Sequence, residues 1–229
     1  MVLDPSTLPD VSDLTVGILG GTGDQGRGLA YRLARSGLAV RIGSRSAPRG
    51  ETAARELAAL PGADGNLSGG DNGYAAAADL VIVAVPWEGH RELVASLAQP
   101  LAGKVVVDCV NPLGFDSHGP YPLAVPEGSA AQQAAGLLPD SRVCAAFHHV
   151  SAVLLADPQV ERIDLDVLVL GEDREAVAQV QALAYRIPNM RGLYAGRLRN
   201  ARQVEALTAN LIAINKRYKA HAGIRVTDV

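Results

Sequence analysis

The sequence predicts an α/β protein built on a doubly wound parallel sheet. Strand-sized apolar runs alternate with segments of helical composition along most of the 229 residues. Several runs, such as LVIVAV at 80–85, are continuously apolar, as expected of strands that helices cover on both faces. A glycine-rich stretch, GILGGTGDQGRG at 17–28, follows the first of these runs.

The expected strands and helices can be placed in order along the chain. Strands are expected at 15–19, 39–43, 66–69, 80–85, 104–110, 142–147 and 165–170, and helices at 26–36, 50–60, 88–98, 128–137 and 173–186. A loop over 111–128 is longer than most connections, which favours a lid or a site loop. The first 13 residues are expected to form a flexible tail.

Composition indicates an ordinary globular protein and excludes several classes. Hydrophobic residues make up 48% and charged residues 20%, and the net charge of −3 gives no reason to expect nucleic acid or a membrane surface as a partner. No apolar run approaches the roughly 18 residues of a membrane helix. Cys109 and Cys144 lie in apolar segments, which is typical of small buried side chains in a reducing cytoplasm. No metal site is expected, because neither cysteine has neighbouring ligands at suitable spacing.

The C-terminal segment differs from the rest in pattern and charge. Over 197–220 an apolar stripe recurs at alternating steps of three and four residues, which predicts a long helix that packs either on its own subunit or in a dimer. The stripe consists of Val204, Leu207, Leu211, Ile214 and Tyr218. From Arg186 onward nine Lys and Arg face two acids, so this end is either a solvated basic face or the receptor of an acidic ligand.

The glycine stretch has the spacing of a dinucleotide-binding turn. Gly21, Gly23 and Gly26 form G-x-G-x-x-G directly after the first strand. Glycine is needed there for a tight turn, for close approach of the backbone to a pyrophosphate, and for helix–strand packing. The N–H groups at the start of the helix then face the diphosphate.

The end of the second strand indicates which dinucleotide binds. An acidic residue there would hold the ribose 2′-hydroxyl of NAD, but the chain has Ser44 and Arg45, followed by Arg49. Two arginines beside the start of a helix are favourable when a dianion lies between them. Together with Thr22 in the glycine turn, these residues predict a 2′-phosphate and therefore NADP(H).

Three further segments fall at the carboxyl ends of strands, where open α/β sheets bind ligands. They are VPWEGH (85–90), CVNPLG (109–114) and FHHVSA (147–152). Each alone is compatible with a simple turn, Trp87 with a surface-packing aromatic, and His148 and His149 with structural histidines. Together they predict the nicotinamide end of the site.

These motifs together resemble the NADPH-dependent coenzyme F420 reductases. The resemblance rests on GGTGDQG, on GSR followed by a basic residue four positions on, and on VPWE, FHHVSA and GRLRNARQVEALT. It implies a Rossmann-type NADP-binding domain over 14–171, a small helical domain over 172–229 that closes the deazaflavin site, a homodimer, and direct hydride exchange between NADPH and the 8-hydroxy-5-deazaflavin coenzyme F420. Two departures are visible: His149-Val150-Ser151 replaces Thr-Ile-Pro of archaeal members, and Arg49 replaces a lysine.

The resemblance also implies the site residues. The expected NADP contacts are Gly21, Thr22, Gly23, Asp24, Gln25, Gly26, Ser44, Arg45, Arg49, Val85, Pro86, Val110, Asn111, Ala152 and Ala222. The expected F420 contacts are Trp87, Pro112, His148, Val150, Ser151, Arg197 and Arg199, the arginines meeting the polyanionic tail. Hydride transfer needs no nucleophile and no metal, so no catalytic residue is assigned; His148 and His149 are the candidates for supplying the proton that the deazaflavin takes up.

Two other functions share the nucleotide signature. Imine and pyrroline-carboxylate reductases have the same NADP domain but a much longer helical C-terminal domain than the segment after Arg186. A regulatory NADP-sensing module would need no second ligand slot beside the nicotinamide. Binding of the deazaflavin separates the sensing module from the reductase.

Overall fold

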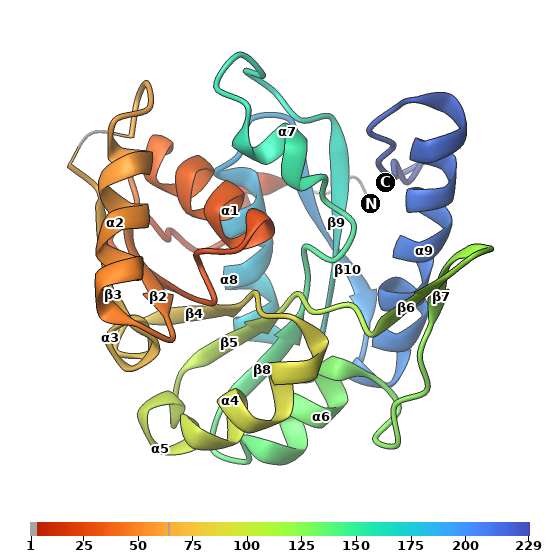
Figure 1. The fold of residues 1–229 in the computed structure, drawn as a ribbon, viewed down its shortest axis with the longest axis horizontal. Coiled ribbons are helices and arrows are strands. Elements are labelled where there is room, and N and C mark those ends of the chain that lie inside the picture. Colours follow the sequence, from red (N-terminus) through yellow and green to blue (C-terminus); the bar gives the residue numbers. More distant parts are fainter. Residues whose placement is uncertain (1–3, 64) are drawn as a thin grey trace.

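The computed structural model describes residues 4–63 and 65–229, and one eight-stranded sheet dominates it (Figure 1). The strand order is β10-β9-β8-β5-β4-β1-β2-β3. The strands are β1 (Thr15–Leu19), β2 (Ala39–Ser44), β3 (Leu67–Asp71), β4 (Leu80–Val83), β5 (Val105–Asp108), β8 (Arg142–Ala145), β9 (Leu165–Gly171) and β10 (Met190–Gly196). The predicted α/β class with a Rossmann-type sheet is confirmed.

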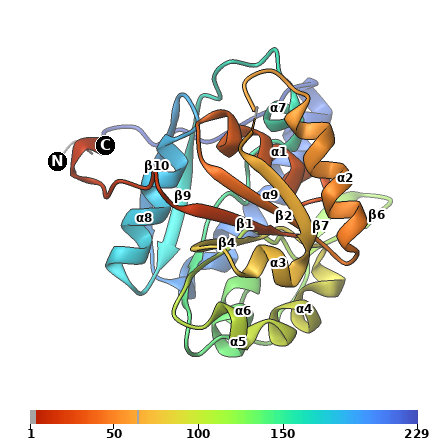
Figure 2. The ribbon, with the colours of Figure 1, turned by 90° about the vertical axis from the view of Figure 1, so that its left-hand side faces the viewer.

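Helices cover both faces of this sheet. Leu29 of α1 (Asp24–Arg35), Leu57 of α2 (Ala47–Ala58) and Leu183 of α8 (Arg174–Tyr185) belong to the apolar core on one face. The core on the other face is formed by α3 (Asn72–Ala76), α4 (His90–Ser96), α5 (Ala98–Leu101), α6 (Ala130–Leu137) and the start of α9 (Ala201–Tyr218). Figure 2 shows α3, α4, α5 and α6 gathered together below the sheet. Double coverage explains the continuously apolar strands.

All seven predicted strands are present, but three details differ. β9 pairs antiparallel with β8, so the sheet is mostly rather than wholly parallel. The runs at 80–85 and 104–110 end as strands at Val83 and Asp108, which leaves Val85 and Val110 in loops at the carboxyl edge. β10 was not predicted, because its sequence MRGLYAG lacks an apolar run; its Gly192 lets α8 approach so closely that a Cβ would lie 2.5 Å from Gln181 Cα.

The long loop at 111–128 contains a hairpin that the sequence pattern does not indicate. β6 (Leu113–Asp116) pairs antiparallel with β7 (Gly119–Pro122), and the hairpin lies against α9 (Figure 1). Phe115 is 68% exposed at this hairpin.

The two ends of the chain are more tied to the body than expected. Segment 172–229 is not purely helical, because β10 belongs to the main sheet and α8 packs on that sheet, whereas the chain after Gly196 contributes no strand. Of the expected tail at 1–13, residues 1–3 lie outside the described residues, Pro5–Thr7 form a short 3-10 helix, and Val11 is buried.

Candidate functional site

The site lies where the chain changes direction in the sheet. β1 and β4 are neighbours, with β2 and β3 on one side and β5 and β8 on the other, so the loops after β1 and β4 diverge at their carboxyl ends. Such a switch point leaves a crevice for a ligand. The segments singled out by sequence follow β1, β2, β4, β5 and β8, and the fold therefore brings them to one edge.

The glycine turn has the geometry of a pyrophosphate cradle. The Gly21 N–H donates to Gly43 O at 2.9 Å, which joins the turn to the end of β2. A Cβ on Gly26 would lie 2.7 Å from Gly21 Cα, so α1 can begin this close to β1 only with glycine at that position. Helix α1 begins at Asp24, and its first N–H groups face the crevice edge.

Gly23 has no such steric reason within the protein. It is the N-cap of α1 at φ −79° and ψ 163°, which any residue adopts, and a Cβ there would meet only Gly20 O at 3.6 Å. Glycine at this position therefore keeps space free outside the turn, as a pyrophosphate requires.

A second group of predicted residues lies beside α2, at the end of β2. Ser44 ends β2 and is buried, whereas Arg45 and Arg49 are exposed at the start of α2. Arg49 lines a shallow hollow with Thr22, Arg27, Pro48 and others. Arg27 pairs with Glu56 at 2.9 Å, but Arg45 and Arg49 make no ion pair within residues 4–63 and 65–229. Both guanidinium groups are thus free for an external anion.

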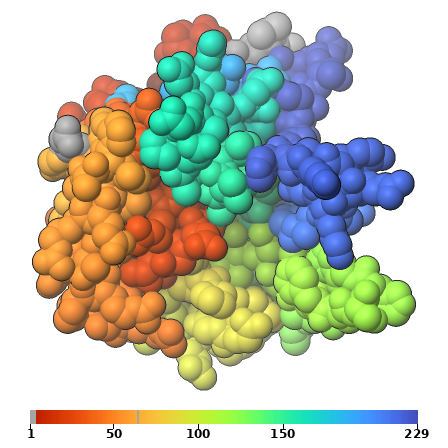
Figure 3. Space-filling view, turned by 45° about the horizontal axis from the view of Figure 1, so that its top comes forward, coloured from red at the N-terminus to blue at the C-terminus, as the bar shows by residue number. Residues whose placement is uncertain are grey.

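A cavity of about 510 Å³ extends from the glycine turn along the carboxyl edge. Figure 3 shows this face, where the teal segment that contains α7 (Ala152–Ala156) lies between the red α1 and the blue α9. The predicted residues that line the cavity are Gly23, Asp24, Gln25, Val85, Pro86, Trp87, Val110, Asn111, His148, His149, Val150, Ser151, Ala152 and Ala222. The structure therefore brings most of the predicted nicotinamide and deazaflavin contacts together.

The two histidines in this wall are buried and neutral. His148 and His149 are 3% and 4% exposed, and their ring nitrogens have no hydrogen-bond partner among the described residues. Burial lowers the pKa of each to about 4. At neutral pH neither ring is an imidazolium, so neither holds an extra proton to give away.

Backbone contacts hold this histidine segment in place. His148 O accepts from Asn111 Nδ2 at 2.8 Å and from Thr208 Oγ1 at 3.2 Å. Phe147 has a φ of 63°, an unfavourable conformation for a bulky residue, and its carbonyl accepts from Gln25 Nε2. The glycine turn, the β5 loop and α9 thus all fix the loop after β8.

Helix α9 supplies four residues of one wall that the sequence did not single out as cavity residues. Thr208, Leu211, Ile212 and Asn215 line the cavity. Asn215 Oδ1 accepts from the N–H of Ala222 at 2.6 Å, which holds the chain after α9 against the opening. The apolar stripe indicated the helix, but not the sheet edge on which it lies.

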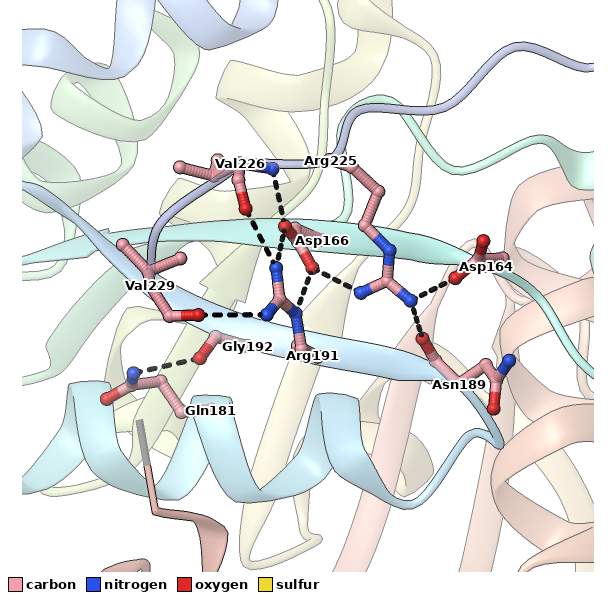
Figure 4. A network of polar contacts seen from close by, with 9 residues as sticks. All are labelled: Asp164, Asp166, Gln181, Asn189, Arg191, Gly192, Arg225, Val226 and Val229. Carbon is pink, nitrogen blue, oxygen red and sulfur yellow. Dashed lines mark hydrogen bonds and ion pairs between the residues drawn. The ribbon is translucent and has the colours of Figure 1, made fainter. Parts of the chain in front are cut away.

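Beyond Ala222 an ion-pair cluster fixes the C-terminal tail (Figure 4). Asp166 of β9 is fully buried and accepts from Arg191 on β10 at 2.6 Å, from Arg225 at 2.7 Å and from the Val226 N–H at 2.7 Å. Burial alone would raise the pKa of Asp166, but these hydrogen bonds outweigh it and hold the pKa at about 2. The only visible signal in the sequence is an aspartate inside the apolar run at 165–170.

The predicted tail contacts lie outside this cavity. Arg197 is exposed and pairs with Glu172 at 3.5 Å, and its contact with the tail stays a prediction. Arg199 lines a separate hollow with Arg202, Gln132 and Gly128, and Pro112 lines a small one with Arg202. Pro112 of the small hollow directly follows Asn111 of the main cavity in the chain. The small hollow and the hollow at Arg199 share Arg202.

The described residues form neither a metal-binding cluster nor a membrane-spanning helix. No three of their histidine, cysteine or acidic side chains are grouped to hold a metal ion. None of the helices within 4–63 and 65–229 has the length and hydropathy needed to cross a bilayer.

Comparison with known proteins identifies relatives over nearly the whole chain. Residues 15–112 match the model of the family described as NADP oxidoreductase coenzyme F420-dependent. The F420-dependent NADP reductase of Methanocaldococcus jannaschii is 38% identical over 94% of this chain and 99% of its own, and that of Methanothermobacter thermautotrophicus is 37% identical over 94% and 96%. Metalloreductase STEAP3 of Rattus norvegicus is 34% identical over 86% of this chain but only 37% of its own.

Solved structures also resemble this chain. A protein of Arthrobacter sp. FB24 assigned as an F420-dependent NADP reductase has a TM-score of 0.77 at 29% identity, with 93% of this chain and 99% of that chain covered. A pyrroline-5-carboxylate reductase from Coxiella burnetii has a TM-score of 0.61 at 11% identity, with 67% of that chain covered, which shows a shared fold only.

Proposed function

Because the chain belongs to the family of F420-dependent NADP reductases, we propose that it exchanges a hydride directly between NADPH and coenzyme F420. The observation that carries this proposal is the extent of the cavity. It begins at the glycine turn, which would hold the pyrophosphate, and continues past Val110 to the segment 148–152. Beside a dinucleotide this leaves a slot for a second ring system.

The reaction is hydride transfer between C4 of the nicotinamide and C5 of the deazaflavin, which requires the two rings to be stacked at close approach. The side chains of this chain do the positioning. Val85, Pro86 and Val110 offer an apolar wall on the β4 and β5 loops, and Val150 and Leu211 face them from the β8 loop and α9. Apolar walls exclude water and favour ring stacking over hydrolytic side reactions.

NADP(H) fits the nucleotide end on three grounds. Gly23 leaves room beside the start of α1, Arg45 and Arg49 are free of acidic partners among the described residues, and Ser44 ends the strand where NAD-specific chains carry an acid. We propose that the arginines hold the 2′-phosphate through charge-assisted contacts.

The proton taken up by the deazaflavin comes from solvent in this proposal. The low pKa of His148 and of His149, about 4 each, leaves both rings neutral at physiological pH. Their ring nitrogens are buried and have no hydrogen-bond partner among the described residues.

The direct test mixes purified protein, NADPH and oxidised F420 and follows the loss of deazaflavin absorbance. We expect loss of absorbance with one NADPH oxidised per F420 reduced. Binding of NADPH with no change in deazaflavin absorbance and no deazaflavin binding would instead support a sensing module.

We further propose that the F420 tail follows Pro112 toward Arg199 and Arg202. These two guanidinium groups line one hollow beside the hairpin, whereas Arg197 is engaged by Glu172. The affinity of full-length F420 is expected to fall steeply with salt, and that of a tail-less analogue only slightly. Identical salt dependence of the two ligands would contradict this path, and Arg197→Ala is the matched control that should leave the F420 KM unchanged.

A homodimer in a reducing cytoplasm is also proposed. The apolar stripe on α9 divides: Val204 and Leu211 are buried in the subunit, while Ile214 and Tyr218 are 40% and 74% exposed. Pairing through the exposed half would cover these two side chains. Ile214→Asp is expected to give a folded monomer in sedimentation, and a wild-type monomer at high concentration would refute pairing through α9. The two free, buried thiols suit the reducing compartment.

A further inference from the structure

A buried ion pair lies directly beneath the cavity and is not part of its lining. His90, the first residue of α4, and Asp108, the last residue of β5, are both 0% exposed. His90 Nε2 lies 2.6 Å from Asp108 Oδ2, a short distance of the kind found in charge-assisted bonds. Burying two ionisable groups costs free energy even when they are paired, so a role for this pair is expected.

The neighbouring hydrogen bonds define the charge on His90. Gln133 Nε2 donates to Glu127 Oε2 at 3.2 Å, so the amide oxygen of Gln133 faces His90 Nδ1, at 2.9 Å. Turning the amide over would place its oxygen against a carboxylate. Nδ1 must therefore donate to Gln133. With Asp108 as a carboxylate, Nε2 donates to it as well, and this arrangement makes His90 an imidazolium.

This pair touches two walls of the cavity. Asp108 Oδ1 accepts from the Val110 N–H at 3.0 Å and so fixes the loop after β5. The Trp87 ring stacks on the His90 ring with centroids 5.5 Å apart and planes inclined by 28°. Val110 and Trp87 both line the cavity, whereas His90 and Asp108 do not.

Charged groups on the surrounding elements favour the imidazolium. From α9, Glu205 accepts from the N–H groups of Ala130 and Ala131, and its charge acts on His90 together with that of Asp108. Burial alone would lower the pKa of His90, but the hydrogen bond and charge of Asp108 outweigh it and raise the pKa above its ordinary value. Burial raises the pKa of Glu205 to about 7.

Two other charged groups lie further out on neighbouring elements. Arg91 pairs with Glu127 at the outer end of the chain of hydrogen bonds. On the cavity side, His148 is neutral at physiological pH.

We propose that His90 is a positioning residue for hydride transfer: its imidazolium locks the Val110 loop through Asp108 and the Trp87 ring by stacking, and so sets the distance between the two reacting rings. The proposal rests on the proposed hydride exchange. The imidazolium joins the loops after β4 and β5 in addition to the backbone hydrogen bond from the Cys109 N–H to Val83 O at 3.2 Å.

The first experiment replaces His90 with glutamine, which is neutral and cannot bridge Asp108 and Gln133 as a double donor. We expect the rate of hydride transfer to fall roughly ten- to a hundredfold, as for small misplacements of reacting groups. The KM for NADPH should be unchanged, because the phosphate contacts lie on the β1 and β2 loops. The matched control is His118→Gln, whose side chain is 93% exposed on the hairpin, and it should behave as wild type. A folded His90→Gln variant with wild-type rate overturns the proposal.

A second variant separates charge from hydrogen bonding. In Asp108→Asn the amide oxygen still accepts from Val110, but the amide nitrogen needs an unprotonated Nε2 on His90. The hydrogen-bond pattern survives while the ion pair is lost. We expect a slower hydride transfer at unchanged NADPH KM; a wild-type rate in this variant overturns the role of the imidazolium, and the variant carries the kinetic test should His90→Gln not fold.

A third measurement needs neither coenzyme nor activity. Nitrogen-15 spectra of the five histidines should show one, absent from His90→Gln, with both ring nitrogens protonated at pH 7. Because Trp87 is the single tryptophan, its fluorescence should change as pH rises through the His90 pKa in wild type and stay constant in His90→Gln. A neutral His90 at pH 7 overturns the proposal, whereas failure of the proposed function would show as an inactive wild-type protein with these signals intact.

Discussion

Replacing Gly23 with alanine should separate cofactor binding from folding. The backbone at Gly23 has φ −79° and ψ 163°, and an added Cβ would meet its nearest atom, Gly20 O, at 3.6 Å, an ordinary contact. The change stabilises by about 0.4–1 kcal/mol through the unfolded chain. The poorer N-cap costs a similar amount. The free energy of unfolding should therefore shift by no more than about 0.5 kcal/mol.

The effect on NADPH should be much larger. The methyl group would occupy the side of the turn that the pyrophosphate approaches, and would separate the phosphates from the N–H groups at the start of α1. Loss of one charge-assisted hydrogen bond costs about 1.5–3 kcal/mol. This corresponds to a roughly ten- to hundredfold weaker Kd.

Calorimetric titration with NADPH and thermal unfolding measure the two effects on the same sample. Gly136→Ala in α6, where a Cβ would meet no atom within 4 Å, is the control that should leave both unchanged or slightly raise Tm. Gly26→Ala should behave oppositely to Gly23→Ala and lower Tm, because its Cβ would lie 2.7 Å from the Gly21 Cα. A Gly23→Ala protein that binds NADPH as wild type does would refute the pyrophosphate placement.

Three further outcomes are expected. Arg45→Ala should weaken NADPH about ten- to a hundredfold and leave NADH unchanged; equal weakening of both, by fluorescence titration, would contradict the 2′-phosphate contact. Because burial holds the pKa of His148 and of His149 at about 4, the unfolded chain, in which they titrate near 6.5, takes up protons that the native rings do not, so with respect to these rings the fold is most stable above pH 6.5. That stability is lost as pH falls toward 4, by about 3 kcal/mol per ring. Replacing both by glutamine should flatten thermal unfolding against pH in this window. Asp166→Asn should loosen the C-terminal tail, seen as faster carboxypeptidase release, and raise the NADPH KM through Ala222, whereas Asp164→Asn, at an exposed partner of Arg225, should do less.

The apolar runs predicted the sheet because their signal is local. Residues 15–19 and 39–43 are buried strands flanked by turn residues, so length and hydrophobicity suffice to place them. β10 escaped prediction because Gly192 and Arg191 serve packing on α8 and the ion pair with Asp166, which are contacts between distant parts of the chain. The hairpin at 113–122 escaped for a similar reason, since its strands are short and glycine- and proline-rich.

The site residues fall into the same two groups, those with a local signal in the sequence and those placed by contacts between distant parts of the chain. Residues that follow a strand directly, such as Gly23, Pro86 and Val110, were predicted because parallel strands bring their carboxyl ends to one edge whatever the details of packing. Asn215 was missed because its place depends on how α9 docks, and a helical stripe specifies a buried face but not the surface that it covers.

His90 and Asp108 show why a buried polar pair is the hardest feature to predict. In sequence His90 ends the segment VPWEGH, and Asp108 sits in an apolar run, and each alone resembles an ordinary turn or strand residue. Only the pairing of β4 with β5 brings their loops side by side, and only the amide of Gln133 from α6 settles which ring nitrogens carry hydrogen. The cost of burying both charges is offset by hydrogen bonds that join α4, β5 and α6, and none of these three elements makes them alone. A group that binds no ligand yet fixes two walls of a ligand site therefore leaves its signal in the folded geometry, and the test of its role is the distance-sensitive hydride step rather than the affinity for either coenzyme.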